Sequence, residues 1–177
     1  MTDNSSIQNV YNWYKFYKSA RERWKALYPD HVDENGSWKN ICKKCNITTS
    51  HFLGWCDKCY NEYTKLRDNY RRKPYNLLKR ISLTSECKIT GCNKQMLKYH
   101  FEKLFTKEMS WDNQSEYWEI DHRIPLCWFD LHNEEEINFA CNYKNLQPMI
   151  KEENREKKFD YPENRLFDYA FHSSQTS

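Results

Sequence analysis

The stretch YWEIDHRIPL, residues 117–126, decides the fold because it places an acid and a histidine at the end of an apolar run. Residues 117–120 predict a short strand, and Pro125 turns the chain into a loop. Neighbouring residues on a strand point to opposite faces. Asp121 can therefore face a metal ion on one side while His122 reaches toward a nearby water molecule.

A second polar stretch, YKNLQPMIKEENREKK at residues 143–158, follows about twenty residues later. Residues 143–147 predict a return strand that ends at Pro148, and residues 149–158 have a helix-forming composition. Asn154 would then lie on a helix that faces the two strands. The carboxylate of Asp121 and the amide oxygen of Asn154 are hard ligands, which suit Mg²⁺ or Mn²⁺ with water and phosphate in the remaining positions.

The length and composition favour one small domain, or a catalytic domain with an accessory module. The chain has 177 residues and a mean hydropathy of -1.08, yet 16% of its residues are aromatic, so the core must depend on Trp, Tyr and Phe. No run approaches the roughly 20 apolar residues that span a bilayer. Residues 1–10 also lack the pattern of a signal peptide. We expect an intracellular protein, cytoplasmic or nuclear, without a membrane partner.

The formal charges are unevenly distributed along the chain. Residues 1–80 carry 16 Lys and Arg against 8 Asp and Glu, whereas residues 81–177 carry 12 against 17. A basic first half predicts contact with a polyanion, although a solvated helix face explains the charges equally well. An acidic second half suits a site for a cation. The candidate nucleic-acid-binding residues of the basic half are Arg71, Arg72, Lys73, Lys79 and Arg80.

Four of the eight cysteines have the spacing of a zinc site. Cys42 and Cys45 form one CxxC pair, and Cys56 and Cys59 form a second pair ten residues later. Two such pairs converge tetrahedrally on one Zn²⁺ ion, and four sulfur ligands leave no open position for a substrate. The zinc is therefore expected to be structural. Cys87, Cys92, Cys127 and Cys141 have no comparable spacing; buried free thiols are the main interpretation, and a second metal cluster is the alternative.

Helical patterns occupy much of the remaining chain. Apolar spacing predicts a helix over residues 5–28 and another after Cys59, which Pro74 interrupts and which resumes as far as Ile81. The basic cluster thus lies on helical surface. Asn133 predicts the cap of a shorter helix. Asn93 predicts the cap of a helix that buries Met96, Leu97, His100, Phe101, Leu104 and Phe105.

Five blocks in the second half of the chain resemble the HNH endonuclease family, especially its phage and large-DNA-virus branch. They are MSWDN at 109–113, WEIDHRIPL at 118–126, FDL at 129–131, YKNLQP at 143–148 and EN at 153–154. The resemblance covers residues 90–158 and is specific because the blocks occur in the family's order. It implies an α+β protein with a ββα-metal core that hydrolyses nucleic-acid phosphodiesters with one divalent cation.

The resemblance also implies residue roles. His122 matches the general base, Asp121 the first metal ligand, Asn145 the residue that orients the histidine, and Asn154 the last ligand, for which many members of the family use histidine. This chain is thus similar to the subset with asparagine there, which leaves its preference between Mg²⁺ and Mn²⁺ open. Arg123 is a further candidate for contact with the scissile phosphate, with a surface salt bridge as the alternative.

These observations predict four segments and one leading function. The segments are an N-terminal helix and loop (1–40), a four-cysteine zinc module with basic helices (41–84), an HNH nuclease domain (85–160) and a C-terminal tail (161–177). We expect a DNA endonuclease, in a virus- or phage-infected cell or a mobile element, that nicks as a monomer or cuts both strands as a homodimer. The alternatives are a catalytically silent, zinc-containing DNA-binding protein with the same fold, and a zinc-ribbon scaffold without a nucleic-acid role.

Overall fold

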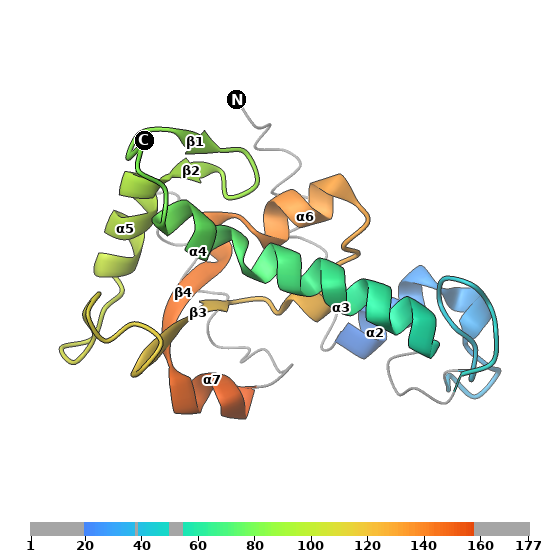
Figure 1. The fold of residues 1–177 in the computed structure, drawn as a ribbon. Helices are drawn as coiled ribbons and strands as arrows, with labels where there is room; N and C mark the ends of the chain where they lie inside the picture. Colours follow the sequence, from blue (N-terminus) through green and yellow to red (C-terminus); the bar gives the residue numbers. More distant parts are fainter. Residues whose placement is uncertain (1–19, 38, 50–54, 158–177) are drawn as a thin grey trace, which may run out of the picture.

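The computed structural model describes residues 20–37, 39–49 and 55–157, which form helices and two small sheets (Figure 1). This mixed architecture agrees with the predicted α+β class. The elements in chain order are α2 (Ala20–Leu27), a 3-10 helix (Pro29–His31), α3 (Asp57–Arg71), α4 (Lys73–Leu78), β1 (Glu86–Cys87), β2 (Cys92–Asn93), α5 (Lys94–Glu102), β3 (Trp118–His122), a 3-10 helix (Leu126–Trp128), α6 (Glu134–Ala140), a 3-10 helix (Tyr143–Asn145), β4 (Leu146–Ile150) and α7 (Lys151–Lys157).

Strands β3 and β4 form an antiparallel pair, and α7 follows β4 without a loop and packs against both strands. In this register Asp121 lies opposite Gln147 and His122 lies opposite Leu146. The strand predicted from residue 117 thus continues through the acid and the histidine. The polypeptide forms a strand, strand, helix unit with the two candidate catalytic residues at the end of its first strand.

Two predicted boundaries around this unit are wrong. Pro148 does not end the return strand but lies inside β4, opposite Ile120. Within the described residues β4 pairs only with β3, so its other edge needs no N–H donor and tolerates a proline. Residues 143–145 form a 3-10 helix instead of a strand, capped by the side chain of Asn142.

Helices α3 and α4 run in nearly one direction across the molecule, with Arg72 at the junction and Pro74 in the first turn of α4 (Figure 1). The predicted interruption near Pro74 is confirmed, because a proline fits the first turn of a helix but not its interior. The predicted extension to Ile81 is wrong. Helix α4 ends at Leu78, and Ile81 is fully exposed in the following loop.

Helix α5 begins as predicted, with the Asn93 side chain accepting a hydrogen bond from the backbone N–H of Met96. The predicted burial holds for Leu97 and Phe101 but not for Met96 and Leu104, which are exposed. The helix buries one narrow stripe, and Met96 lies just outside it. The predicted cap of α6 at Asn133 is also confirmed.

Two apolar clusters form the core. One joins Trp55 and Tyr63 of the cysteine-rich region to Leu126 and Trp128 of the loop after β3. The other packs α4 and α5 against β3 and β4 through Leu77, Leu97, Phe101, Trp118 and Leu146. Both clusters therefore contain side chains from each side of the boundary predicted between residues 84 and 85.

The predicted N-terminal helix is described only over Ala20–Leu27. The rest of that prediction, residues 5–19, and the predicted tail at 161–177 lie outside the described residues. Among the described helices none combines the length and apolar character needed to cross a membrane.

Candidate functional site

A pocket of about 440 Å³ brings the predicted acid, histidine and asparagine together. Asp121 and His122 reach it from β3, and Asn154 reaches it from the first half of α7. Arg71, the last residue of α3, and Arg72, at the junction with α4, also line the pocket and belong to the predicted basic cluster. Residues that are more than 80 positions apart in the chain thus line one cavity.

The carboxylate of Asp121 is buried and held from two sides. Its Oδ2 accepts hydrogen bonds from Gln147 Nε2 at 2.7 Å and from Lys157 Nζ at 2.5 Å. Lys157 also donates to the backbone oxygen of His122 at 2.7 Å, so α7 is tied to the end of β3. These bonds fix the carboxylate and leave its second oxygen as the atom that can face a ligand.

The imidazole of His122 is buried in the pocket wall, and within the described structure its Nε2 has no hydrogen-bond partner. Burial, helped by the positive charges of Lys157 and Arg71, lowers the pKa of His122 to about 3. The ring is therefore neutral at physiological pH. The neutral imidazole has a ring nitrogen that can accept a proton, but Nε2 is covered by neighbouring atoms, and a pKa of about 3 makes His122 a weak base until a bound anion offsets the charges of Lys157 and Arg71.

Asn145 is buried behind the pocket. Its side-chain oxygen accepts from the Ile124 N–H at 2.9 Å, and its Nδ2 donates to the oxygens of Ile124 and Ala140 at 3.2 and 2.8 Å. Its backbone oxygen also accepts from the Arg123 N–H at 2.7 Å. Asn145 thus fixes the backbone immediately after His122, and the hydrogen bonds of its amide go to that loop and to α6 rather than to the imidazole.

Five further residues take part in the site. Glu119 and Arg67 line the pocket, and the Glu119 carboxylate accepts from Asn154 Nδ2 at 3.2 Å. Tyr75 lines it from α4 and accepts from the Ile120 N–H at 3.1 Å. The sequence contains a pattern that could have indicated two of these residues. Glu119 is two residues before Asp121 on a strand, and Arg67 is four residues before Arg71 on a helix, so each lies on the same face as the predicted residue. The contacts of Gln147 and Lys157 with Asp121 depend on how β4 pairs with β3 and on the position of α7, so no local pattern indicated them.

The remaining basic candidates lie outside the pocket lining. Lys73, Lys79 and Arg80 are on α4 and the loop after it, and Lys79 and Arg80 are exposed. Arg123 is also absent from the pocket lining, although it follows His122 directly in the chain. The structure therefore groups Arg67, Arg71 and Arg72 with the candidate catalytic residues and separates Arg123 from them.

The donor atoms around the pocket fit a hard divalent cation. The free oxygen of Asp121 and the amide oxygen of Asn154 are oxygen ligands of the kind that Mg²⁺ and Mn²⁺ prefer, and Glu119 adds a second carboxylate nearby. Lys157 opposes this fit, because its ammonium group already neutralises Asp121. A cation at this place would therefore be held weakly.

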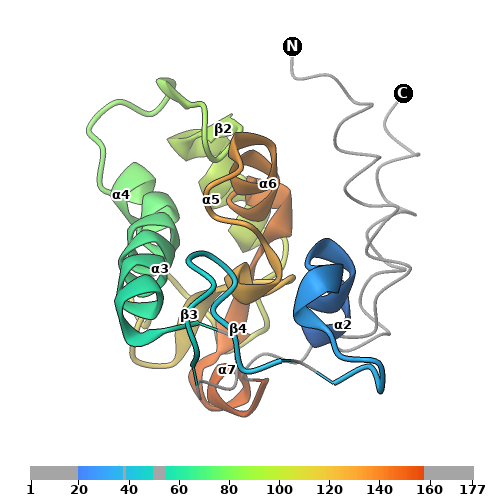
Figure 2. The same cartoon turned by 90° about the vertical axis from the view of Figure 1, so that its right-hand side faces the viewer.

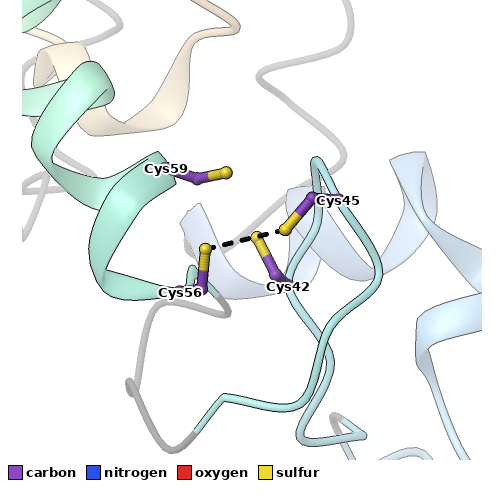
Figure 3. Close-up of side chains that lie close together, drawn as sticks. All are labelled: Cys42, Cys45, Cys56 and Cys59. Carbon is purple, nitrogen blue, oxygen red and sulfur yellow. Dashed lines mark hydrogen bonds between the residues drawn. The ribbon is translucent and has the colours of Figure 1, made fainter.

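The four predicted zinc ligands converge at the start of α3 (Figure 3). Their sulfur atoms all lie within 4.8 Å of one another, and Cys45 and Cys56 are 3.6 Å apart at Sγ. All four are free thiols. Burial alone would raise the pKa of Cys42, but backbone N–H groups of Cys56, Cys45 and Lys44 outweigh it and lower the pKa to about 6. The arrangement fits a tetrahedral zinc ion.

The other four cysteines are also free thiols. Within the described residues, Cys42, Cys45, Cys56 and Cys59 are the one set of three or more His, Cys, Asp or Glu side chains close enough to share a metal ion. Cys87 and Cys92 face each other across the β1–β2 pair. The arrangement agrees with free thiols at these positions.

Two proteins of Acanthamoeba polyphaga mimivirus are similar to this chain. "Uncharacterized protein L426" is 33% identical over 149 residues, which cover 77% of this chain and 63% of the relative. "Uncharacterized protein L246" is 28% identical over 87 residues, which cover 49% and 38%. The chain thus spans less than two thirds of either relative. No family model matches the chain, and no solved structure matches it significantly.

Proposed function

We propose that this protein is a metal-dependent endonuclease that hydrolyses DNA phosphodiester bonds, with His122 as the general base. The observation that carries the proposal is the buried His122 ring nitrogen, without a hydrogen-bond partner among the described residues, in a pocket also lined by Asp121, Asn154 and the arginines of α3. A base, oxygen ligands and guanidinium groups around one cavity are the components of metal-assisted phosphoryl chemistry.

The chemistry divides among the residues of the pocket. The imidazole of His122 takes a proton from a water molecule, and the resulting hydroxide attacks phosphorus while the sugar oxygen on the far side leaves with the bond electrons. Arg67 and Arg71 hold the phosphate opposite His122, since a guanidinium matches phosphate geometry. A divalent cation held by Asp121 and Asn154 supplies positive charge to the phosphate and to the leaving oxygen.

The four-cysteine cluster is proposed to hold a structural zinc ion that stabilises the start of α3. Cys56 is the N-cap of this helix and Cys59 lies in its first turn. The same helix presents the pocket arginines two to four turns later. In this proposal the zinc positions a substrate-holding helix and takes no part in bond cleavage.

A catalytically silent DNA-binding protein is the second candidate, and one contact favours it. Lys157 Nζ lies 2.5 Å from Asp121 Oδ2, where its charge takes the place that a metal ion has in the first proposal. A site neutralised by a lysine binds phosphate without needing a cation. The two candidates differ in whether DNA is cut.

The test is plasmid cleavage by purified protein with Mg²⁺ or Mn²⁺, beside DNA binding without either added cation. We expect nicked or linear plasmid, and a rate on the order of 10² to 10⁴ lower for His122→Ala, because a general base contributes a factor of that size. His132→Ala is the matched control, since His132 is an exposed histidine outside the pocket. Binding without cutting by the wild type, or full cleavage by His122→Ala, would refute the nuclease proposal.

A further inference from the structure

The loop that joins α4 to β1, residues 79–85, exposes two aliphatic side chains. Ile81 is 100% exposed and Leu83 is 52% exposed. Figure 2 shows the loop leaving the end of α4 and projecting on the side of the molecule on which α3 and α4 lie. We call residues 79–85 the 79–85 loop. Two large aliphatic groups exposed within three residues are a candidate contact surface when their surroundings are complementary to a partner.

The 79–85 loop is held at both ends by hydrogen bonds. Lys94 Nζ donates to Arg80 O at 2.8 Å, and the Gln95 N–H donates to Leu83 O at 3.2 Å, so the first turn of α5 supports the loop. The Ser85 N–H donates to Ser82 Oγ at 3.2 Å. A supported backbone presents Ile81 and Leu83 with little entropy left to lose on binding.

The surroundings of the loop are basic. Residues 79–98 carry five basic side chains and one acid, Glu86. Lys79 and Arg80 begin the loop, and the ammonium group of Lys94 lies against it. An apolar tip inside a positive surface is complementary to a partner with an anionic backbone and an apolar interior. Double-stranded DNA has this character, because its stacked bases lie between two rows of phosphates.

The loop is also at a suitable distance from the pocket. Seven residues of nearly continuous helix separate Arg71 in the pocket wall from Leu78, which is about 10 Å of rise. The loop begins there and extends further. At roughly 3.4 Å per base pair, a duplex with its phosphate at Arg71 passes the loop about three to five base pairs away.

We propose that the 79–85 loop inserts Ile81 and Leu83 between base pairs about three to five steps from the cut phosphate, so that the preferred substrate is duplex DNA with a weakened or already unstacked step. The inference rests on the proposed function for the identity of the ligand. Opening an intact base step costs a few kcal/mol, whereas a mismatched step is already weakened. The protein therefore discriminates substrates by the ease of unstacking.

The test compares the affinity of the full chain for two duplexes of about 30 base pairs, one matched and one with a central mismatch, without added Mg²⁺ or Mn²⁺, so that the duplexes stay uncut and the cysteine cluster keeps its metal. We expect the wild type to bind the mismatched duplex at least about 10-fold more tightly, because part of the unstacking free energy has already been lost at the mismatch. The double variant Ile81→Ser, Leu83→Ser should bind both duplexes equally. Leu27→Ser, which alters an exposed leucine on α2, is the control and should keep the preference.

A second readout is the fluorescence of 2-aminopurine placed beside the mismatch, which rises when the base is unstacked. We expect the rise with the wild type and not with the double variant.

Two outcomes overturn the loop proposal. One is an equal mismatch preference in the wild type and the double variant. The other is a shift of the double variant from dimer to monomer in sedimentation, which would make the loop a contact between copies. A mismatch preference without plasmid cleavage supports the loop and refutes the nuclease. Plasmid cleavage without a mismatch preference refutes the loop proposal and supports the nuclease.

Discussion

Asn145 is the side chain that holds the loop after His122 in place. Its amide makes three hydrogen bonds to buried backbone groups of Ile124 and Ala140. In Asn145→Ala these groups lose their partners, and each buried unsatisfied group costs about 1–3 kcal/mol. We expect the free energy of unfolding to fall by about 2–4 kcal/mol in urea titrations. Asn142→Ala, which removes one cap bond at the surface, is the comparison and should cost about 1 kcal/mol.

The thiols of the β1–β2 pair differ in acidity although they face each other. Burial alone would raise the pKa of Cys87, but hydrogen bonds from Thr90 and the Ile89 N–H outweigh it and lower the pKa. Burial raises the pKa of Cys92 to about 11. A lowered pKa means a larger thiolate fraction at every pH below it, and thiolate is the reactive form.

We therefore expect Cys87 to be alkylated before Cys92 when the folded protein meets iodoacetamide at about pH 7–8. The modified positions are read by mass spectrometry of the digested protein. As the pH rises from about 7 to about 9, the rate at Cys87 should level off earlier than that of a free cysteine. Cys141, whose pKa burial raises to about 12, should react last. Equal labelling of Cys87 and Cys92 would contradict this order.

Helix α7 supplies a lysine that competes with any cation for Asp121. The Lys157–Asp121 pair is almost completely buried, so Lys157→Met leaves a buried carboxylate with Gln147 as its remaining described partner. Breaking a buried ion pair costs about 3–5 kcal/mol. We expect the melting temperature of Lys157→Met to fall in a chelator. We also expect millimolar Mn²⁺ to restore it, because a bound cation replaces the missing charge.

The wild type provides the comparison for this prediction. Its melting temperature should rise less with Mn²⁺, since Lys157 already neutralises Asp121. Asp121→Asn in the Lys157→Met background should abolish the response, because an amide leaves no charge for the cation. A rise of equal size in all three proteins would place the cation elsewhere.

The strand, strand, helix unit was predictable because its signals are local. The apolar run before Asp121 and the helix-forming composition after Met149 each depend on neighbouring residues, as does the cap of α5 at Asn93 outside the unit. The ends of β4 and α4 depend on what lies beside them. Pro148 is tolerated because β4 has an edge without a partner strand among the described residues, and the helix predicted to Ile81 ends at Leu78, where contacts with α5 hold the loop. Those partners are distant in the chain.

The candidate site also has a part that was predictable from the sequence and a part that was not. The carboxylate, imidazole and amide were recognisable from their order and spacing, and the pocket groups Asp121, His122 and Asn154. The contacts that support these side chains could not be predicted from the sequence. Gln147 reaches Asp121 through the strand register, and Arg67 reaches the pocket because α3 packs over the loop after β3. Tertiary packing, which no short stretch encodes, decides which basic residues line the cavity.

The molecule as a whole connects the cysteine cluster to the pocket through one apolar core. Cys42, Cys56 and Cys59 belong to the same buried cluster as Ile124 and Leu126, which follow His122. Figure 1 shows α3 extending from the cysteine-rich end toward α4 and the sheet. If the cluster holds zinc as proposed, its loss would act on two parts of the pocket lining, since α3 carries Arg67 and Arg71 and the loop after β3 carries Leu126.

Zinc removal should for this reason impair substrate binding as well as stability. We expect the purified protein to hold one zinc per chain by mass spectrometry, and Cys59→Ser to lose it. A loss of about 4 kcal/mol in a chain of this size lowers the melting temperature by roughly 10 °C. The same variant should bind DNA more weakly, because Arg67 and Arg71 lose their fixed position. Cys87→Ser, outside the cluster, should keep both zinc and affinity. A zinc-free Cys59→Ser that melts and binds like the wild type would show that α3 holds its place through apolar packing alone.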